Sequence, residues 1–349
     1  MSFPLNVYLA ATVFAFVVSA LALPRWRGWC LRTGLVDEPG HRKLQDRAVP
    51  LAGGFAVMTG LLFPTLIFAL LLWVKSAGGA IGNSAPGRET SEGLRPLASV
   101  LDANAASLLR YGLNRRALEL LVILAGALGM LLVGWVDDKR ELRPGLKFAG
   151  QLLIAALVAA SGVRITLFVH SLVFQYAITI LWILAVINAF NFMDNMNGLC
   201  AGLGAIGAWY FAVIAAADGQ YLVALIAFMT FGALLGFLPH NFPRATAFLG
   251  DSGSHLVGYL LAVLAILPHF YTTRHPRHWA VLIPLLVLSV PLLDMTWVVI
   301  LRWRKGQPFY VGDTNHLSHR LVRRGFSRTL AVLIIWLMAA AIGGFVYLC

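Results

Sequence analysis

The chain has 349 residues, of which 59% are hydrophobic and only 12% are charged, and its formal net charge at pH 7 is +12. Ordinary soluble domains carry about a quarter charged residues, so this composition excludes that class and predicts a polytopic membrane protein. The basic residues are spread over separate loops rather than along one stripe. This pattern argues against nucleic-acid binding and favours contact with the lipid bilayer and with phosphorylated substrates.

Apolar segments follow one another along most of the chain, and a membrane-spanning helix needs about 20 mostly apolar residues. We therefore expect an all-α fold, in which residues 1–349 form a single transmembrane catalytic domain with about ten spanning helices. No positive residue precedes the first segment, so we expect it to remain as a helix rather than to be a signal peptide. The ten predicted spans are residues 6–23, 51–74, 117–135, 147–162, 171–188, 199–217, 221–238, 255–270, 279–301 and 329–348.

The distribution of lysine and arginine predicts how these spans are oriented. The loops that follow odd-numbered spans contain 18 of the 27 basic residues. Cytoplasmic loops are enriched in these residues, so this set is predicted to be cytoplasmic and both termini to be external, with residues 75–116 as an external loop. The predicted cytoplasmic loops are residues 24–50, 136–147, 189–198, 239–254 and 302–328.

Acidic residues are scarce, and several of them lie at the ends of apolar runs. Asp137 and Asp138 stand side by side directly after the uncharged run Leu120–Val136, and Asp194 and Asp251 lie in short polar clusters at two other boundaries. Adjacent carboxylates repel each other and are costly at the edge of hydrocarbon. The doublet therefore indicates a cation site or a proton-transfer site, unless neighbouring cations simply balance carboxylates that end a helix.

Two polar clusters combine asparagine, aspartate and glycine. In residues 188–198, Asn191 and Asp194 are three apart and would share one face of a continuing helix. In residues 241–254, glycines flank Asp251, which can present a carboxylate to a metal while backbone N–H groups face phosphate. Either cluster could instead be an ordinary capping loop.

Candidate phosphate-binding residues occur in the two most basic of the predicted cytoplasmic loops. Lys43 precedes a glycine pair that permits close backbone approach. His316, His319 and Arg320 lie in the last predicted cytoplasmic loop, where no third ligand for a zinc site is evident. Both loops could also be solvated positive-inside segments.

Asp294 differs from the other acids because it lies within a predicted span, on its cytoplasmic half. An acid inside the membrane is a functional candidate by default, with a structural partnership to a neighbouring helix as the alternative. All five polar loop clusters fall on the same predicted face. We therefore predict one active site at the cytoplasmic face.

The arrangement of these clusters resembles the polyprenyl-phosphate N-acetylhexosamine-1-phosphate transferases of glycosyltransferase family 4. Within that family it is more similar to the UDP-GlcNAc:undecaprenyl-phosphate branch than to the phospho-MurNAc-pentapeptide transferases, which usually carry a triple-histidine stretch. The chain departs from the usual family pattern at Asn195, Asn197 and Ser318. The matching stretches, in family order between about residues 34 and 321, are DEPGHRK…PLAGG, GWVDDKREL…LKFAGQ, NAFNFMDNMNGL, NFPRATAFLGDSGS and PLLDMTWVVILRWRKGQPF…DTNHLSHRL.

The resemblance implies transfer of a sugar-1-phosphate, by default GlcNAc-1-phosphate, from a UDP-sugar to undecaprenyl phosphate in the bacterial cytoplasmic (inner) membrane. UMP would be released, and Mg²⁺ would be required, with Mn²⁺ as an alternative. The phospho-MurNAc-pentapeptide reaction remains an alternative within the family, and a homodimer is left open. A secondary transporter is the alternative from another class, but its acids would concentrate at the bilayer midplane and inverted repeats would be common.

The resemblance also implies roles for individual residues. Asp251 would be the leading Mg²⁺ ligand, with Asp194 close by, and Asp137 and Asp138 would activate the lipid phosphate or complete the metal shell. The remaining residues would bind substrate: Lys43, Lys147, Asn191, Asn197, Asp294, His316, His319 and Arg320.

Overall fold

The computed structural model describes residues 5–38, 48–81, 103–268, 270, 278–308, 310 and 313–348. In this part of the chain the fold is helical apart from one short pair of strands, β1 (Val36–Asp37) and β2 (Val49–Pro50). The all-α prediction is confirmed. The helices are α1 (Leu5–Thr33), α2 (Gly53–Ile81), α4 (Ala103–Arg140), α5 (Pro144–Ala160), α6 (Leu172–Met193), α7 (Leu199–Ala217), α8 (Tyr221–Phe237), α9 (Gly250–Leu264), α10 (Ile283–Val287), α11 (Ser289–Arg304), α12 (Leu317–Arg323) and α13 (Arg328–Leu348), with 3₁₀ turns at Leu238–His240 and His278–Leu282.

Seven described helices are long and apolar enough to cross a membrane: α1, α2, α4, α6, α7, α8 and α13. An eighth span is possible if α10 and α11 cross together, although the chain bends by 71° between them. At two further predicted spans, α5 has 17 residues and α9 has 15. Both are shorter than the roughly 20 residues of a straight crossing. The count of ten spans therefore stays a prediction.

The outer surface of the bundle is apolar, as a lipid-facing surface requires. Leu121 on α4 is 65% exposed and Leu337 on α13 is 70% exposed. Soluble proteins rarely expose large continuous apolar areas, whereas lipid tails solvate them at no cost. The exposed leucines therefore support a membrane location for the helical bundle.

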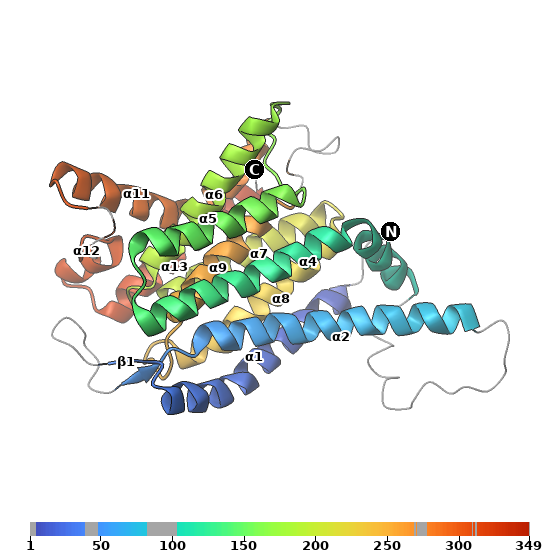
Figure 1. The fold of residues 1–349 in the computed structure, drawn as a ribbon, viewed down its shortest axis with the longest axis horizontal. Coiled ribbons are helices and arrows are strands. Elements are labelled where there is room, and N and C mark those ends of the chain that lie inside the picture. The colour runs from blue at the N-terminus through green and yellow to red at the C-terminus, as the bar shows by residue number, and fades with distance from the viewer. Residues whose placement is uncertain are drawn as a thin grey trace.

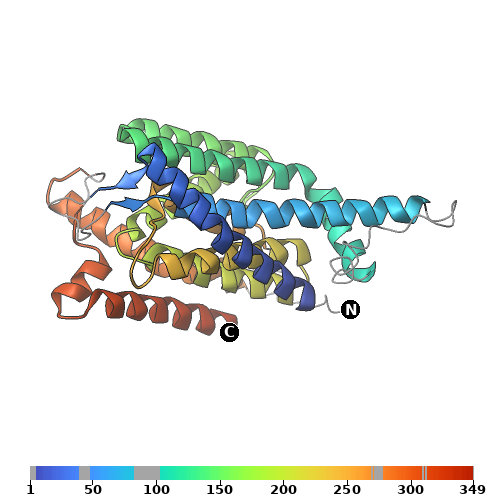
Figure 2. The same cartoon turned by 90° about the horizontal axis from the view of Figure 1, so that it is seen from below.

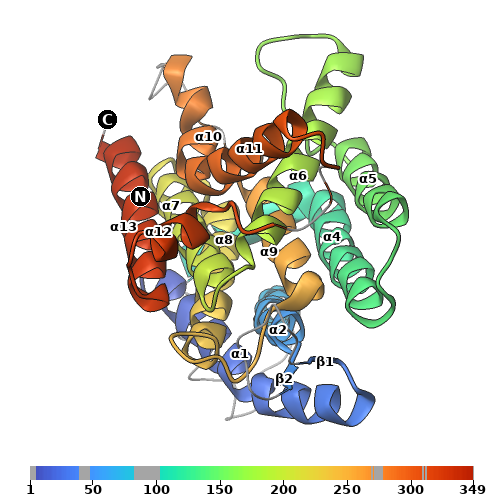
Figure 3. The ribbon, with the colours of Figure 1, turned by 90° about the vertical axis from the view of Figure 1, so that its left-hand side faces the viewer.

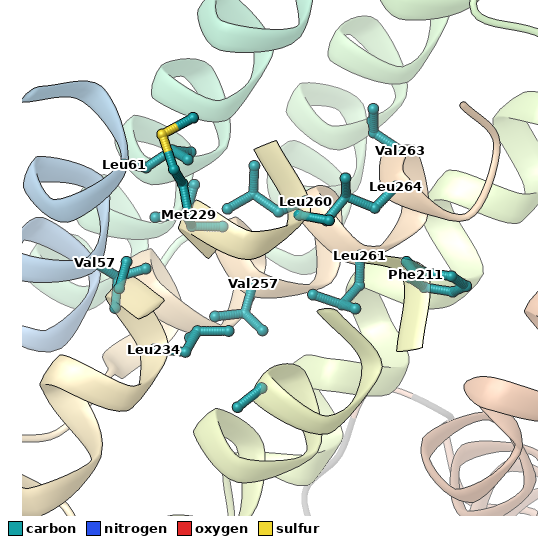
Figure 4. Packing of buried hydrophobic residues seen from close by; sticks show 14 of the residues in the cluster. Val57, Leu61, Phe211, Met229, Leu234, Val257, Leu260, Leu261, Val263 and Leu264 are labelled. Carbon is teal, nitrogen blue, oxygen red and sulfur yellow. The ribbon is translucent and has the colours of Figure 1, made fainter. Parts of the chain in front are cut away.

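Helix α9 lies at the centre of the bundle, where α2, α4, α6 and α7 surround it (Figures 1 and 3). Every residue from Ser252 to Leu264 is buried. A helix that is buried on all sides needs a largely apolar surface all round, and α9 supplies one from Leu256 onward. Figure 4 shows Val257, Leu260, Leu261 and Leu264 of α9 packed among Val57 and Leu61 of α2, Phe211 of α7, and Met229 and Leu234 of α8.

Two glycines allow neighbouring helices to approach the first turn of α9 closely. A Cβ atom on Gly134 of α4 would overlap the backbone of Asp251 and Ser252, and one on Gly54 of α2 would overlap the backbone of Gly253. Backbone atoms cannot rotate away as a flexible side chain can. Glycine at these positions therefore sets how closely α2 and α4 pack against Asp251.

Replacing Gly134 with alanine is expected to lower the free energy of unfolding by about 1–3 kcal/mol, because overpacking displaces backbone atoms. Thermal unfolding of the purified protein in detergent measures the effect. Gly145→Ala is the matched control, since a Cβ at Gly145 meets no atom within 4 Å. Equal melting temperatures for the two variants would contradict the packing argument.

The short strands and α12 gather at one end of the bundle (Figure 1). The strands pair antiparallel, Val36 with Pro50 and Asp37 with Val49. Phe248 then donates its backbone N–H to the Pro50 carbonyl at 3.0 Å, which joins this segment to the loop before α9. The outer ends of α1 and α13, which lead to the chain termini, point away from this end (Figure 2).

Candidate functional site

A cavity of about 1870 Å³ opens at the end of the bundle that carries β1 and α12. All five loops that the charge distribution places on one face contribute to it. Its lining contains carboxylates, carboxamides and cations, among them Asp37, Asp138, Asn191, Asp194, Asn195, Asn197, Arg244, Asp251, Lys305, His319 and Arg328.

Asp251 is the residue at which four helices meet. It lies in the first turn of α9, where its Oδ2 accepts from Lys147 Nζ of α5 at 3.0 Å and its Oδ1 accepts from Asn191 Nδ2 of α6. The same Lys147 Nζ is 2.7 Å from Oδ2 of Asp137 on α4. Burial acts to raise the pKa of Asp251, but its neighbours, led by the Lys147 ammonium, together hold that pKa below its ordinary value. Asp251 is therefore ionised at neutral pH.

The aspartate doublet at the end of α4 divides into two roles. Asp138 lines the cavity and accepts the backbone N–H groups of Asp251 at 2.7 Å and Ser252 at 3.0 Å, so it caps the N-terminus of α9. Asp137 is buried, and its Oδ1 accepts from the Leu142 N–H at 2.8 Å in the turn after α4. Only Asp138 is placed to meet a substrate in the cavity.

Asp194 extends the acidic side of the cavity. It follows the last residue of α6, is half-buried, and lines the cavity together with Asp251, Asp138 and Asp37. Burial raises its pKa well above the ordinary value, and the charges of those three carboxylates raise it further. Such mutual repulsion is what a bound cation would relieve.

The donor set fits a hard divalent cation that is held in part by substrate. Within the described residues, no group of three His, Cys, Asp or Glu side chains converges to hold a metal by protein ligands alone. Mg²⁺ usually keeps several waters and is bound through one or two carboxylates plus substrate phosphates. Asp194 and Asp251 can supply those two carboxylates, and the exclusively oxygen character of the set suits Mg²⁺ or Mn²⁺.

Asp294 and His316 form a buried pair behind the cavity wall. His316 Nδ1 lies 2.7 Å from Oδ2 of Asp294, whose Oδ1 accepts from the Leu317 N–H at 2.6 Å. The imidazole meets the ring of Phe192 edge-on, with centroids 5.6 Å apart. Neither residue lines the cavity. The geometry matches the structural interpretation of Asp294, because this carboxylate of α11 anchors the start of α12.

The other basic residues of this loop lie in different surroundings. His319 lines the cavity, and burial, His316, Arg323 and Arg328 together hold its pKa below the ordinary value, so its imidazole is neutral. The Arg320 guanidinium instead lies over the ring of Trp297 at 5.3 Å from its centroid. His319 is thus the member of the predicted set that can contact substrate directly.

The three departures from the family pattern connect separate loops. Ser318 donates to Asn195 Oδ1 at 2.7 Å, which ties the start of α12 to the loop between α6 and α7. Asn197 donates its Nδ2 to the Pro243 carbonyl at 3.1 Å, which ties the same loop to the one before α9. Ser318 and Asn195 therefore contact each other, and Asn195 and Asn197 line the cavity.

The predicted site residues divide by their position relative to the cavity. Lys43 lies outside the described residues. Lys147 contacts two carboxylates and is not a lining residue of the cavity, and its substrate-binding role stays a prediction. Those that line the cavity are Asp138, Asn191, Asp194, Asn197, Asp251 and His319; those that are not lining residues are Asp137, Lys147, Asp294, His316 and Arg320.

Three cations that line the cavity were not selected from the sequence. Arg244 lies beside Pro243, Lys305 follows α11, and Arg328 begins α13. Lys305 and Arg328 occur in the most basic loop, and Arg244 is the single lysine or arginine of residues 239–254. In both loops, charge alone does not distinguish a substrate contact from a positive-inside residue. Only their positions around the cavity single them out.

The sequence matches the model of glycosyl transferase family 4 over residues 120–269. A decaprenyl-phosphate N-acetylglucosaminephosphotransferase of Mycolicibacterium smegmatis is 31% identical over 97% of this chain and 81% of its own length. A probable undecaprenyl-phosphate N-acetylglucosaminyl 1-phosphate transferase of Bacillus subtilis is 28% identical over 93% of this chain and 81% of its own length. An undecaprenyl-phosphate alpha-N-acetylglucosaminyl 1-phosphate transferase of Yersinia pestis is 25% identical over 96% of this chain and 80% of its own length. The acidic cavity at the end of an apolar bundle and these similarities agree: the chain belongs to glycosyl transferase family 4.

Proposed function

We propose that the protein transfers N-acetylglucosamine-1-phosphate from UDP-GlcNAc to a polyprenyl phosphate and releases UMP. The observation that carries this proposal is the cavity, where Asp138, Asp194 and Asp251 share one space with Arg244 and Arg328 at the end of a lipid-facing bundle. Carboxylates suit a cation and arginines suit phosphate groups. The relatives named above act on undecaprenyl or decaprenyl phosphate.

Phosphoryl transfer depends mainly on positioning and on neutralising charge, so each side of the cavity has a task. Arg244, Lys305 and Arg328 would hold the diphosphate of the donor. Asp194 and Asp251 would hold Mg²⁺, which when bound neutralises negative charge on that diphosphate. Lys147 and Asn191 hold the Asp251 carboxylate in place through the contacts described above.

The reaction joins an oxygen of the lipid phosphate to the phosphorus that carries the sugar, and it breaks the bond from that phosphorus to the oxygen of UMP. The attacking phosphate must first lose any proton it carries. Asp138 is the member of the doublet that faces the cavity, and we assign this proton to its carboxylate. Asp137 contributes indirectly, because it holds Lys147.

The proposed location is a bacterial cytoplasmic membrane, with the cavity on the cytoplasmic side and both termini external. A UDP-sugar is soluble and a polyprenyl phosphate is embedded in lipid, so the cavity must be open to both phases at the membrane boundary. The 18 basic residues in the loops that form this face support the orientation. None of the relatives named above is a phospho-MurNAc-pentapeptide transferase, and that alternative is disfavoured.

Purified protein supplied with UDP-GlcNAc, undecaprenyl phosphate and Mg²⁺ is expected to release UMP in a one-to-one ratio to lipid product. EDTA should stop the reaction, and added Mg²⁺ should restore it, because the cation neutralises the diphosphate. UMP is measured by chromatography and the lipid product by mass spectrometry.

A panel containing UDP-GalNAc and UDP-MurNAc-pentapeptide in parallel reactions tests the assignment of the donor. Faster turnover of either compound than of UDP-GlcNAc would contradict that assignment. Substrate-driven ion flux in proteoliposomes without UMP release would contradict the enzymatic function and support a transporter.

A further inference from the structure

A second set of polar side chains lies one helical turn away from the Asp251 contacts, deeper inside the bundle. We call Lys147, Asn191 and Asp251 the site layer. The buried layer is formed by Gln151 of α5, Asn188 of α6 and His255 of α9. Spacings of three or four residues put each member on the same helix face as its counterpart in the site layer. The same three helices therefore contribute one side chain to each layer.

The hydrogen bonds of the buried layer determine which atom donates and which atom accepts at each contact. Asn188 Nδ2 donates to the Leu184 carbonyl at 2.8 Å and to Gln151 Oε1 at 2.9 Å. Because Gln151 Oε1 is an acceptor here, the amide group of Gln151 presents its Nε2 to His255 Nε2, 3.3 Å away. The network thus assigns His255 Nε2 as an acceptor and His255 as a neutral imidazole protonated on Nδ1.

Burial of the polar side chains of this layer costs free energy. Gln151 and His255 are both 0% exposed, and His255 Nδ1 has no hydrogen-bond partner among the described residues. The next residues of α9, Leu256 and Val257, are apolar and buried. An apolar side chain at residue 255 would avoid the cost of a buried polar group. A network of this kind fixes one arrangement of the helices that share it, because any slip or rotation leaves its members unpaired.

We propose that His255 is a positioning residue for the reaction. Through Gln151 and Asn188, it holds α5 and α6 in register against α9, so that Lys147 and Asn191 both meet the Asp251 carboxylate. This inference rests on the proposed function, because its effect is measured on UMP release. Displacements of about 1 Å can cost about 100-fold in rate, so modest slippage of one helix would be detectable.

Replacing His255 with leucine is expected to lower kcat for UMP release by at least about 10-fold. The KM for UDP-GlcNAc should stay within about twofold, because Arg244, Lys305 and Arg328 lie outside both layers. His255→Gln should recover most of the rate, since its amide oxygen can take the place of the imidazole Nε2 as the acceptor from Gln151. His255→Asn keeps polarity but is too short to reach Gln151, and it should remain slow.

Tyr259→Phe is the matched control, one turn further along α9. It removes another buried hydrogen bond, from the Tyr259 hydroxyl to the Ile123 carbonyl at 3.0 Å, which has no link to either layer. Its kcat should equal that of the unmodified protein. Thermal unfolding of every variant identifies any that fail to fold.

The double variant His255→Leu with Gln151→Leu separates positioning from independent structural effects. If both residues act through one network, its rate loss should not exceed that of the slower single variant, whereas independent effects would multiply. The inference is overturned if His255→Leu turns over at the unmodified rate, if His255→Gln is as slow as leucine, or if the losses multiply. Absence of UMP release by the unmodified protein would contradict the proposed function instead.

Discussion

Replacement of Asp251 with alanine is expected to lower kcat for UMP release by about 100-fold or more, since removal of one group that stabilises transition-state charge has an effect of this size. The change removes a proposed Mg²⁺ ligand. It also leaves Lys147 with a single carboxylate partner and Asn191 Nδ2 without its Asp251 acceptor. UMP release at saturating substrates, repeated over a range of Mg²⁺ concentrations, measures the loss.

Asp218→Ala provides the control for removing a carboxylate. Asp218 ends α7, and the loop that it begins contributes no described residue to the cavity. This control should retain unmodified turnover. Full turnover by Asp251→Ala under the same conditions would show that the metal site is wrongly assigned, and an unchanged Mg²⁺ requirement with reduced turnover would assign Asp251 a role other than metal binding.

Replacement of Lys147 with methionine should have an effect of comparable size. The change removes the cation between Asp137 and Asp251, whose carboxylates lie 2.7 and 3.0 Å from its Nζ. Breaking a largely buried ion pair by removing one partner costs about 3–5 kcal/mol of stability, because the remaining charges are uncompensated. We expect a lower melting temperature and a kcat reduced by about 100-fold, with KM for UDP-GlcNAc nearly unchanged.

The split between kcat and KM distinguishes two roles for this lysine. If Lys147 instead bound the donor, as the family resemblance implies, the methionine variant would raise KM and leave kcat nearly intact. The control is Lys139→Met, because Lys139 is exposed and its ammonium lies 5.7 Å from the centre of the Trp135 ring. Loss of melting temperature in this control would show that removal of any lysine destabilises the bundle.

Much of the architecture could be predicted because apolar runs and charged loops follow simple physical rules. Long uncharged runs must be helical in lipid, and basic loops collect on one side. These rules also placed Asp138, Asn191, Asp194 and Asp251 on one face, and all four line the cavity. The number of spans was harder to predict, because α9 is a short helix surrounded by protein and its apolar sequence resembles that of a lipid-facing helix.

The pairing of side chains could not be predicted in the same way. Lys147 and Asp251 are 104 residues apart, and Asp294 reaches His316 across a loop. Loop composition favoured phosphate contact for His316, and the family resemblance implied substrate binding by Lys147, yet each contacts carboxylates and neither is a lining residue of the cavity. Likewise, nothing in the sequence around the doublet indicates that Asp138 caps α9 while Asp137 holds Lys147.

By itself, the sequence determined that this is a membrane-embedded helical protein with its acids and amides at one boundary, because hydrophobic burial and loop charge depend on local composition. Only the tertiary structure decided which of those groups reach the cavity and which support others from behind. That choice depends on how closely α4, α5, α6 and α9 approach one another, through contacts such as Gly134 against the backbone of Asp251. Distances between helices are set by the packing of the whole bundle, and no local stretch of sequence specifies them.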